Sequence, residues 1–210
     1  MFNLEDLLDR QQKALPLMED FYSIQGEGFH QGRAAYFIRL GGCDVGCVWC
    51  DVKESWDKDK HPKHSTKEIL SKVQSSNTDF VVVTGGEPFM HDCKSLTNEL
   101  NTKGYELAVE TSGAYPISGD WDWICVSPKK FKAPLQKVLA QAHELKVIIF
   151  NKSDFAWAEE HKALVNPNCK LFLQPEWSKE KEMSKLIVDY VKLNPDWNIS
   201  LQIHKYLDLR

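Results

Sequence analysis

The sequence lacks a long uncharged apolar stretch, and none of its apolar runs approaches the roughly 20 residues that a membrane-spanning helix needs. Its first residues, Met1 to Asp6, also lack the basic segment followed by an apolar one that marks a secretory signal peptide. We therefore expect a cytoplasmic protein that has no membrane among its partners.

The sequence also lacks an excess of positive charge. Lysine and arginine total 26 against 30 aspartate and glutamate residues, and the formal net charge of −4 gives no general attraction to a polyanion. We therefore expect no nucleic acid among the partners. Glycine (11) and proline (9) are too few for a collagen-like or disordered chain, and 42% of the residues are hydrophobic, which predicts a folded core.

The length of 210 residues suits one domain, at roughly 100–200 residues per domain. Residues 1–14 are polar and weakly helical, so we expect a peripheral extension there and a single domain over residues 15–210. Beyond Met18, short apolar runs alternate with longer segments of mixed polarity, which is typical of strand–helix units with parallel strands. Crossovers between such units curl the sheet toward an open or closed barrel.

This alternation predicts eight strands and five helices. The strands are expected at residues 20–24, 35–40, 80–84, 106–110, 123–127, 145–150, 170–174 and 199–203. The helices are expected at residues 66–74, 93–102, 134–143, 155–164 and 179–193. The first of these helices has the most definite start, because Ser65 and Glu68 have the spacing of a capping box.

Residues suited to a binding site follow five of the predicted strands. In parallel α/β sheets the site forms at the carboxyl ends of the strands. The sequences at these ends are GGC (41–43), GGEP (85–88), TSG (111–113), PK (128–129) and PE (175–176). We expect them to build one site.

The six cysteines do not form an evenly spread disulfide framework. Cys43, Cys47 and Cys50 fall in one short loop, and in a chain without a targeting segment such a cluster points to a metal centre. Three thiolates leave one iron of a cubane cluster open to a small molecule, whereas a structural zinc site needs a fourth ligand. His61 or His64 could supply that ligand, so the triplet alone leaves zinc and iron–sulfur equally open.

A second motif, Thr84 to Pro88, shifts this balance toward iron–sulfur. It ends a predicted buried strand with two glycines, which allow close approach to a ligand, and then places Glu87 beside them. A zinc-binding module has no need of this motif. Arg39 ends another apolar run and needs an anionic partner, for which a substrate carboxylate fits the guanidinium. A structural ion pair is the alternative for Arg39.

With these motifs the chain resembles the radical S-adenosylmethionine superfamily, whose cluster loop has the spacing C-x3-C-x2-C and whose next strand typically ends in Gly-Gly-Glu-Pro. Within this superfamily, the chain resembles the 7-carboxy-7-deazaguanine synthase family. The segments that carry this resemblance come in the family's order and span the chain from about residue 15 to its end. The matching segments are YSIQGEG (22–28), FIRL (37–40), CVWCD (47–51), ETSG (110–113), VSPK (126–129) and QIHKY (202–206).

The resemblance implies an incomplete TIM-type barrel of about six parallel strands with fewer flanking helices, working as a homodimer. It implies a carbon–nitrogen lyase that contracts the ring of 6-carboxy-5,6,7,8-tetrahydropterin to 7-carboxy-7-deazaguanine and releases ammonia, a step in queuosine and 7-deazapurine biosynthesis. The implied cofactors are a 4Fe–4S cluster, S-adenosylmethionine and Mg²⁺. A flavodoxin-like protein is the implied electron donor.

The same resemblance implies which residues carry each role, with no catalytic group beyond the cluster and the cofactor. Cys43, Cys47 and Cys50 hold the cluster. The residues implied to bind S-adenosylmethionine are Trp49, Cys50, Asp51, Gly86, Glu87, Ser127, Pro128, Lys129, Gln174, Pro175, Glu176 and Trp177. Those implied to bind the pterin are Ile24, Gln25, Gly26, Glu27, Arg39, Thr84 and His204, with Glu27 facing a pterin N–H. For His204, a histidine satisfied within the fold is an equal alternative.

One position departs from the family. Members tend to carry Thr or Ser two residues after the last cluster cysteine, where the hydroxyl helps to hold magnesium, and this chain has Val52. Valine offers no oxygen ligand, which magnesium requires, although Asp51 could supply one. We therefore expect a weakened dependence on magnesium.

Two other functions remain as alternatives. An activating enzyme that places a glycyl radical on a partner protein would share the cluster loop and the Gly-Gly-Glu-Pro motif, but would not need Arg39 to hold a pterin. A zinc-stabilised binding module would use the three cysteines and a histidine.

Overall fold

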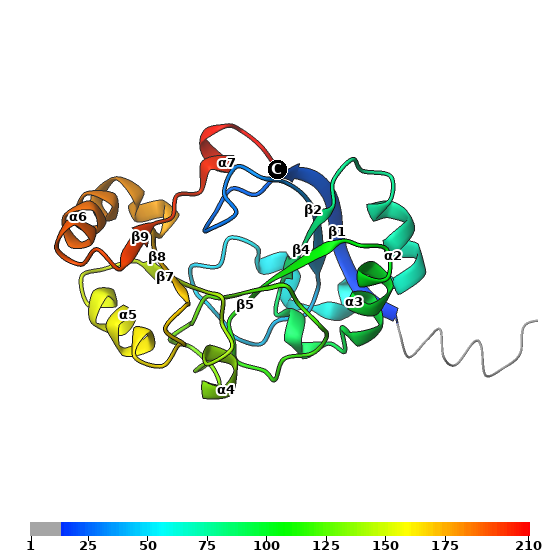
Figure 1. Cartoon of the computed structure of the whole chain (residues 1–210), viewed down its shortest axis with the longest axis horizontal. Coiled ribbons are helices and arrows are strands. Elements are labelled where there is room, and N and C mark those ends of the chain that lie inside the picture. The colour runs from blue at the N-terminus through cyan, green and yellow to red at the C-terminus, as the bar shows by residue number, and fades with distance from the viewer. Residues whose placement is uncertain (1–13) are drawn as a thin grey trace, which may run out of the picture.

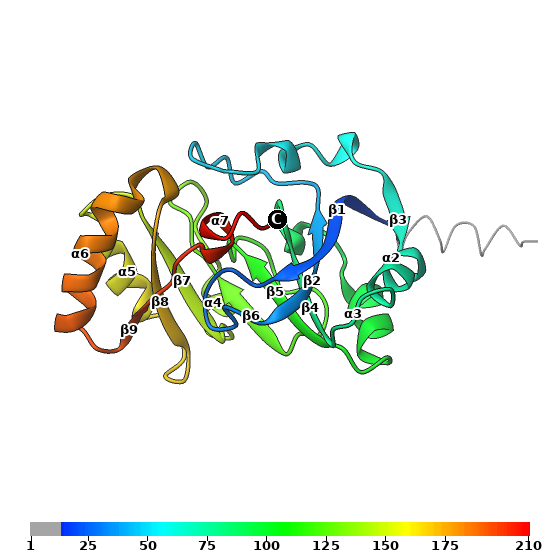
Figure 2. The same cartoon turned by 90° about the horizontal axis from the view of Figure 1, so that it is seen from above.

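The structure is a computed structural model that describes residues 14–210. The extension expected at residues 1–14 therefore lies outside the described residues, apart from Ala14, which is already the first residue of a strand. The described strands form one curved sheet in the order β3-β1-β2-β4-β5-β6-β7-β8-β9, and the larger helices lie along its outer side (Figure 1, Figure 2).

The elements have the following bounds. The strands are β1 (Ala14–Ile24), β2 (Ala34–Leu40), β3 (Lys63–Ser65), β4 (Phe80–Gly85), β5 (Glu106–Thr111), β6 (Trp123–Val126), β7 (Glu144–Ile149), β8 (Lys170–Pro175) and β9 (Trp197–Ile199). The α-helices are α2 (Thr66–Val73), α3 (Lys94–Asn101), α4 (Gln136–Leu139), α5 (Asp154–Lys162), α6 (Glu180–Leu193) and α7 (Ile203–Tyr206). The 3₁₀-helices are η1 (Lys53–Trp56), η2 (Lys58–Lys60), η3 (Pro88–Met90) and η4 (Trp177–Lys179).

The sheet is mostly parallel and open. Strands β2 and β4 to β9 pair in parallel, which confirms the expected α/β class and the partial barrel. β1 instead pairs antiparallel with both β2 and β3. The connection between β1 and β2 spans only residues 25–33, and a parallel crossover needs about a dozen residues or more. The three-residue β3 was not predicted because so short a segment shows no periodicity.

The core explains why the central strands are continuously apolar. On β4, Val81 and Val83 pack with residues of α2 and α3, whereas Phe80 and Val82 belong to a second cluster with Phe37 of β2. Both faces of β4 are therefore buried, as the apolar run predicted.

Local signals fixed the start of α2 but not the length of α4. Both hydrogen bonds of the predicted capping box at Ser65 are present, so that prediction is confirmed. The helix expected at residues 134–143 is wrong in extent, because α4 covers only Gln136–Leu139. Its end tightens into short-range bonds, with the Ala142 N–H donating to the Leu139 carbonyl at 3.1 Å, before the chain enters β7.

The strand expected at residues 199–203 is also wrong. β9 ends at Ile199, and the following Ser200 is fully buried, with its hydroxyl donating to Gln174 at 2.6 Å. The chain then turns into α7, where the Ile203 N–H donates to the Gly26 carbonyl at 3.0 Å. The C-terminal segment therefore returns from β9 toward the end of β1, as Figure 1 shows.

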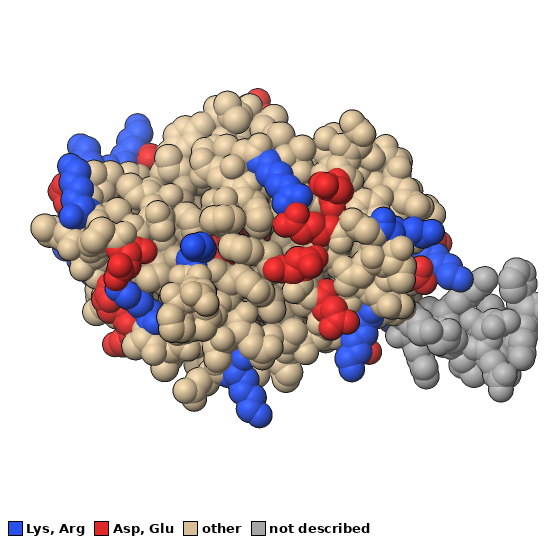
Figure 3. Space-filling view, in the orientation of Figure 1, with Lys and Arg blue, Asp and Glu red and all other residues tan. Residues whose placement is uncertain are grey.

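The surface carries charges of both signs. On the face seen in Figure 3, lysine and arginine lie among aspartate and glutamate side chains. Within residues 14–210, no helix combines the length and apolar character that crossing a membrane requires.

Candidate active site

The carboxyl ends of the parallel strands surround a cavity of about 280 Å³. Its walls come from the ends of β2, β4, β5, β6, β7 and β8, from the residues that follow β1, and from the C-terminal segment. Residues as distant in the chain as Gln25 and Gln202 therefore line one space. Each of the five predicted strand-end segments contributes at least one residue to the lining, so all five meet at one cavity.

The cysteine loop forms one wall of this cavity. Cys43, Cys47 and Cys50 all line it, and all three are free thiols. Gly42 and Gly46 adopt φ values of +103° and +75°, a region that favours glycine, and so allow the loop its tight path. Burial raises the pKa of the Cys47 thiol to about 11, against the lowering effect of the Lys129 ammonium. A bound metal centre would favour the deprotonated form of all three cysteines, because metal binding and thiol deprotonation are coupled.

The histidines proposed as a fourth zinc ligand are engaged elsewhere. The His61 ring nitrogen Nε2 lies 2.9 Å from the Glu54 carbonyl oxygen, and the ring packs against Gly41. His64 lies in β3, opposite Leu15. Neither histidine lines the cavity. The cysteine loop therefore offers three cysteine ligands to the cavity, which fits a cluster with one iron open to a small molecule.

The two glycines of the Gly-Gly-Glu-Pro motif pack the end of β4 against the end of β2 and against the cysteine loop. A Cβ on Gly85 would lie 2.2 Å from the Leu40 carbonyl oxygen, and a Cβ on Gly86 would lie 2.2 Å from the Gly42 oxygen. Backbone bonds hold the same contact, with the Glu87 N–H donating to the Gly42 carbonyl at 2.8 Å. The glycines are therefore required by the protein's own backbone, in addition to any ligand.

Glu87 lies outside the cavity lining, although it was predicted to contact the cofactor. It is 1% exposed, and its carboxylate accepts hydrogen bonds from the Thr111 hydroxyl at 2.6 Å, the Ser112 N–H at 2.8 Å and the Phe89 N–H at 3.1 Å, as well as from the Ser112 hydroxyl. Both oxygens are thus occupied by protein donors. Glu87 ties the end of β4 to the end of β5.

The other residues predicted to bind S-adenosylmethionine line the cavity, with the exception of Pro128. The lining members are Trp49, Cys50, Asp51, Gly86, Ser127, Lys129, Gln174, Pro175, Glu176 and Trp177. Lys129 donates to the Ser127 hydroxyl at 2.5 Å and lies 5.5 Å from the centre of the Trp49 ring. Burial lowers the pKa of Lys129.

All the residues predicted to bind the pterin also line the cavity. They are Ile24, Gln25, Gly26, Glu27, Arg39, Thr84 and His204. Arg39 makes the ion pair that was its alternative role, with Nε 2.8 Å from Glu19 Oε1, while Arg210 binds the other oxygen of Glu19 at 2.9 Å. The His204 ring packs against Gly26 so closely that a Cβ there would lie 2.1 Å from Nδ1. Burial lowers the pKa of His204.

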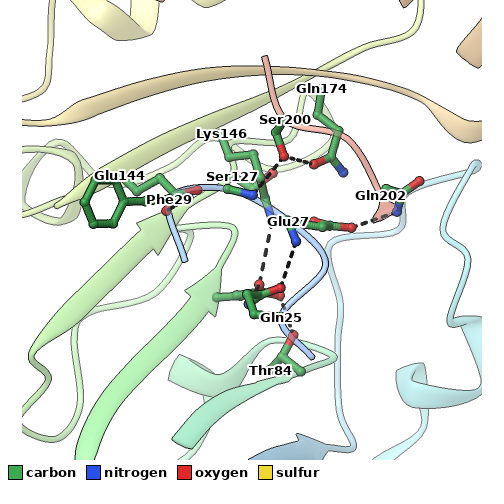
Figure 4. A network of polar contacts seen from close by, with 12 residues as sticks. Gln25, Glu27, Phe29, Thr84, Ser127, Glu144, Lys146, Gln174, Ser200 and Gln202 are labelled. Atoms are coloured by element: carbon green, nitrogen blue, oxygen red, sulfur yellow. Dashed lines mark hydrogen bonds and ion pairs between the residues drawn. The ribbon is translucent and has the colours of Figure 1, made fainter. Parts of the chain in front are cut away.

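The floor of the cavity holds a polar network that connects Glu27 and Thr84 with residues that had no predicted role (Figure 4). Lys146 of β7 donates to Glu27 Oε2 at 2.5 Å and lies 3.7 Å from Glu110 Oε1. Gln202 donates to Glu27 Oε1 at 2.8 Å, and Thr84 donates to Glu110 Oε2 at 3.0 Å. Burial alone would raise the pKa of Glu27, but the charge and hydrogen bond of Lys146 outweigh it and lower that pKa to about 2.

Three residues of this network were missed as site residues. Lys146 fell inside a predicted strand, where a single lysine among apolar residues gave no signal, although a buried lysine implies a buried anion. Glu110 and Gln202 stood in segments that resemble the family but carried no assigned role. All three line the cavity.

The position that departs from the family also faces the cavity. Val52 lines it with an apolar side chain, and the neighbouring Asp51 forms an exposed ion pair with Lys205 at 3.3 Å. The only oxygen-bearing side chain of the two is thus already paired with an ammonium group.

Comparison with known proteins agrees with this geometry. Residues 37–124 match the Radical SAM superfamily. A 7-carboxy-7-deazaguanine synthase from Flavobacterium psychrophilum is 57% identical over 195 residues, which cover 93% of this chain and 92% of the relative. The chain belongs to the 7-carboxy-7-deazaguanine synthase family. A second member of the family, from Synechocystis sp., is 47% identical over 195 residues, which cover 93% of each chain.

A solved structure of the family shares the fold. The crystal structure of QueE from Escherichia coli superposes with a TM-score of 0.84 at 30% identity, covering 96% of this chain and 99% of that one. The predicted family, the fold class and the assignment as a radical S-adenosylmethionine lyase are therefore confirmed. Membership implies a 4Fe–4S cluster and S-adenosylmethionine as cofactors. Neither the activating enzyme nor the zinc-stabilised module is favoured.

Proposed function

We propose that the cavity holds S-adenosylmethionine and 6-carboxy-5,6,7,8-tetrahydropterin side by side, and that the enzyme contracts the pterin ring to 7-carboxy-7-deazaguanine with release of ammonia. The observation that carries this proposal is that one cavity is lined by two chemically different groups of residues. Cys43, Cys47 and Cys50 form the first group, and Arg39, Gln25 and Glu27 form the second.

Cys43, Cys47 and Cys50 would hold the cluster, with one iron left for the amino and carboxylate groups of the cofactor. When bound, the reduced cluster and S-adenosylmethionine supply the one-electron chemistry that removes a hydrogen atom from the substrate. The protein's own tasks are to bind, to orient and to exclude water. Gly86 lets the end of β4 pack closely against the cysteine loop, and Lys129 with Ser127 offers polar contacts from the end of β6.

Among the residues proposed to bind the pterin, Arg39 is the partner for the substrate carboxylate. Its contact with Glu19 uses Nε alone, which leaves both terminal nitrogens to form a bidentate pair. Gln25 and Glu27 lie where the chain leaves β1, and their orientation is fixed, because Gln25 Oε1 accepts the Glu27 N–H at 3.0 Å. Their remaining acceptor capacity suits the N–H groups of a pterin ring.

Magnesium has a weaker role in this proposal than in most of the family. Val52 provides no oxygen, and the ion pair of Asp51 with Lys205 competes with a cation. We propose that the enzyme retains activity without added magnesium.

We further propose a cytoplasmic homodimer of chains whose residues 15–210 form one domain, reduced by a flavodoxin-like protein. Val48, next to the cluster cysteine Cys47, is 68% exposed, which supports access of an electron donor to the cluster loop.

The test is anaerobic. The protein is purified, its iron and acid-labile sulfide are quantified, and products are followed by mass spectrometry after addition of dithionite, S-adenosylmethionine and the pterin. We expect about four irons per chain, which is the content of one 4Fe–4S cluster, together with 5′-deoxyadenosine and 7-carboxy-7-deazaguanine. Cys50→Ser should abolish both, whereas Cys169→Ser, a buried cysteine outside the cavity, should retain them.

Cofactor cleavage with an untouched pterin would contradict the proposed substrate and favour an activating enzyme. A colourless protein with one zinc per chain would contradict the cluster and every role that depends on it.

A further inference from the structure

One buried lysine in the floor of the cavity has no part in the roles described above. Lys146 projects from β7 with a side chain that is 5% exposed, and it lies between Glu27, which follows β1, and Glu110 on β5. Figure 4 shows the side chain pointing toward Glu27. Its Nζ is 2.5 Å from Glu27 and 3.7 Å from Glu110, so one ammonium serves two carboxylates.

The network leaves these carboxylates with unused acceptor capacity. Glu27 accepts from Lys146 and from Gln202, one donor on each oxygen. Glu110 accepts from Gln25 at 3.1 Å on one oxygen and from Thr84 on the other. A carboxylate can accept about four hydrogen bonds, so both have lone pairs left. Because both line the cavity, the donors that complete them can come from a bound ligand.

The floor brings two carboxylates to one ammonium group, that of Lys146. Repulsion between like charges in a buried site is offset by a cation that lies beside both of them. The charged and titratable groups around Lys146 are Glu27, Glu110, Cys125, Lys129 and Glu144, and His204 faces Glu27. Burial would lower the pKa of Lys146, but these acidic neighbours outweigh it, so the pKa is raised well above its ordinary value.

A lysine that holds its proton so firmly acts as a fixed charge and not as a proton donor. We propose that Lys146 is a positioning residue for the substrate: it keeps Glu27 ionised and orients both Glu27 and Glu110, so that both can accept hydrogen bonds from the N–H groups of a pterin ring. This inference rests on the proposed function, and it names a residue that governs how the pterin ring is recognised. Arg39 binds the carboxylate of the substrate, whereas Lys146 acts on its ring through the two glutamates.

The test compares three variants with the wild type. Lys146→Met removes the charge at similar length, Lys146→Arg keeps the charge, and the double variant Lys146→Met/Glu27→Gln removes one charge of each sign. Lys162→Met is the matched control, because Lys162 pairs with Asp196 at 2.9 Å outside the cavity. Iron content and thermal unfolding are measured for each protein, followed by kcat/KM for the pterin across pH.

For Lys146→Met we expect kcat/KM to fall about 100-fold through a rise in KM, the size expected when a buried carboxylate loses its charged partner. The acid limb of the pH profile should move upward by about 2 on the pH scale, because burial is then no longer offset by Lys146 and raises the pKa of Glu27. Lys146→Arg should recover most of kcat/KM. The double variant should bind pterin weakly, but the acid limb of its pH profile should lie where it does in the wild type. Lys162→Met should match the wild type in both respects.

A Lys146→Met enzyme whose kcat/KM changes by less than about 3-fold, or falls equally at every pH, overturns the inference. Should Lys146→Met not fold, the double variant decides alone: a profile like that of the wild type supports the inference, and a shifted acid limb overturns it. A wild-type protein that forms no product from the pterin contradicts the proposed function instead, which separates the two failures.

Discussion

Replacement of Gly86 by alanine tests whether the Gly-Gly-Glu-Pro motif is needed to pack the cysteine loop. Gly86 does not adopt a positive φ, so alanine there adds no left-handed strain. Its Cβ would lie 2.2 Å from the Gly42 oxygen and 3.1 Å from Cys43 Cβ, both on the cluster loop. An ordinary contact begins near 3.4 Å, so the loop has to retreat by more than 1 Å.

The cost follows from two contributions. Overpacking of this kind typically costs about 1–3 kcal/mol. The retreat of the loop also breaks the 2.8 Å hydrogen bond from the Glu87 N–H to the Gly42 carbonyl, which is worth about 1 kcal/mol. We therefore expect Gly86→Ala to lose about 2–4 kcal/mol in free energy of unfolding. The variant should also hold less than the full complement of iron.

Gly46→Ala is the control within the same loop. Gly46 has a φ of +75°, and no atom lies within 4 Å of the position that a Cβ would take, so alanine adds left-handed strain of about 1–2 kcal/mol without a collision. Denaturant unfolding and iron and sulfide content are measured for both variants. If Gly86→Ala binds a full cluster and unfolds with the wild-type free energy, the packing role assigned to Gly86 is wrong.

Three further predictions concern single side chains. Arg39→Gln should raise KM for the pterin about 10- to 100-fold, since it removes a charge-assisted pair, and an unchanged KM in steady-state kinetics would limit Arg39 to its ion pair with Glu19. Val52→Thr should gain stimulation by magnesium in assays with and without a chelator, whereas a wild type that is inactive without magnesium would contradict the weak dependence. Burial alone would raise the pKa of Asp20, but Lys72 and the Tyr36 hydroxyl outweigh it and lower that pKa. Asp20→Asn should therefore lower the free energy of unfolding, measured with denaturant at pH 7, by about 1 kcal/mol. This loss should shrink as the pH falls below 3.8, the ordinary pKa of an aspartate, toward pH 3. A loss that does not depend on pH would refute the charge argument.

The parts of the fold that the sequence predicted well are those with local causes. The capping box at Ser65 forms between residues three apart, so its outcome depends little on the rest of the chain. The apolar run of β4 predicted a strand buried on both faces, because hydrophobic burial dominates the placement of such a run.

The parts predicted poorly depend on contacts between distant residues. The strand expected after Ile199 is replaced by a turn and α7, because Ser200 bonds to Gln174 on β8 and Ile203 to Gly26 after β1. α4 is short because the chain on either side of it is bound to other segments: the Leu135 N–H donates to the Gly113 carbonyl at 2.8 Å, and the His143 N–H donates to the Ile124 carbonyl at 2.9 Å. Periodicity along the sequence contains no information on such partners.

The same division applies to the site. The cysteine loop and the glycines beside it were predictable from the residues alone, since three closely spaced thiols and a tight backbone are properties of short segments. Which charges meet depends instead on the packing of the whole sheet: Glu27, Glu110 and Lys146 come from three different parts of the chain, and Lys146 stands 119 positions from Glu27. In a buried space a charge is stable only beside its partner, and the partner is chosen by how the strands pack.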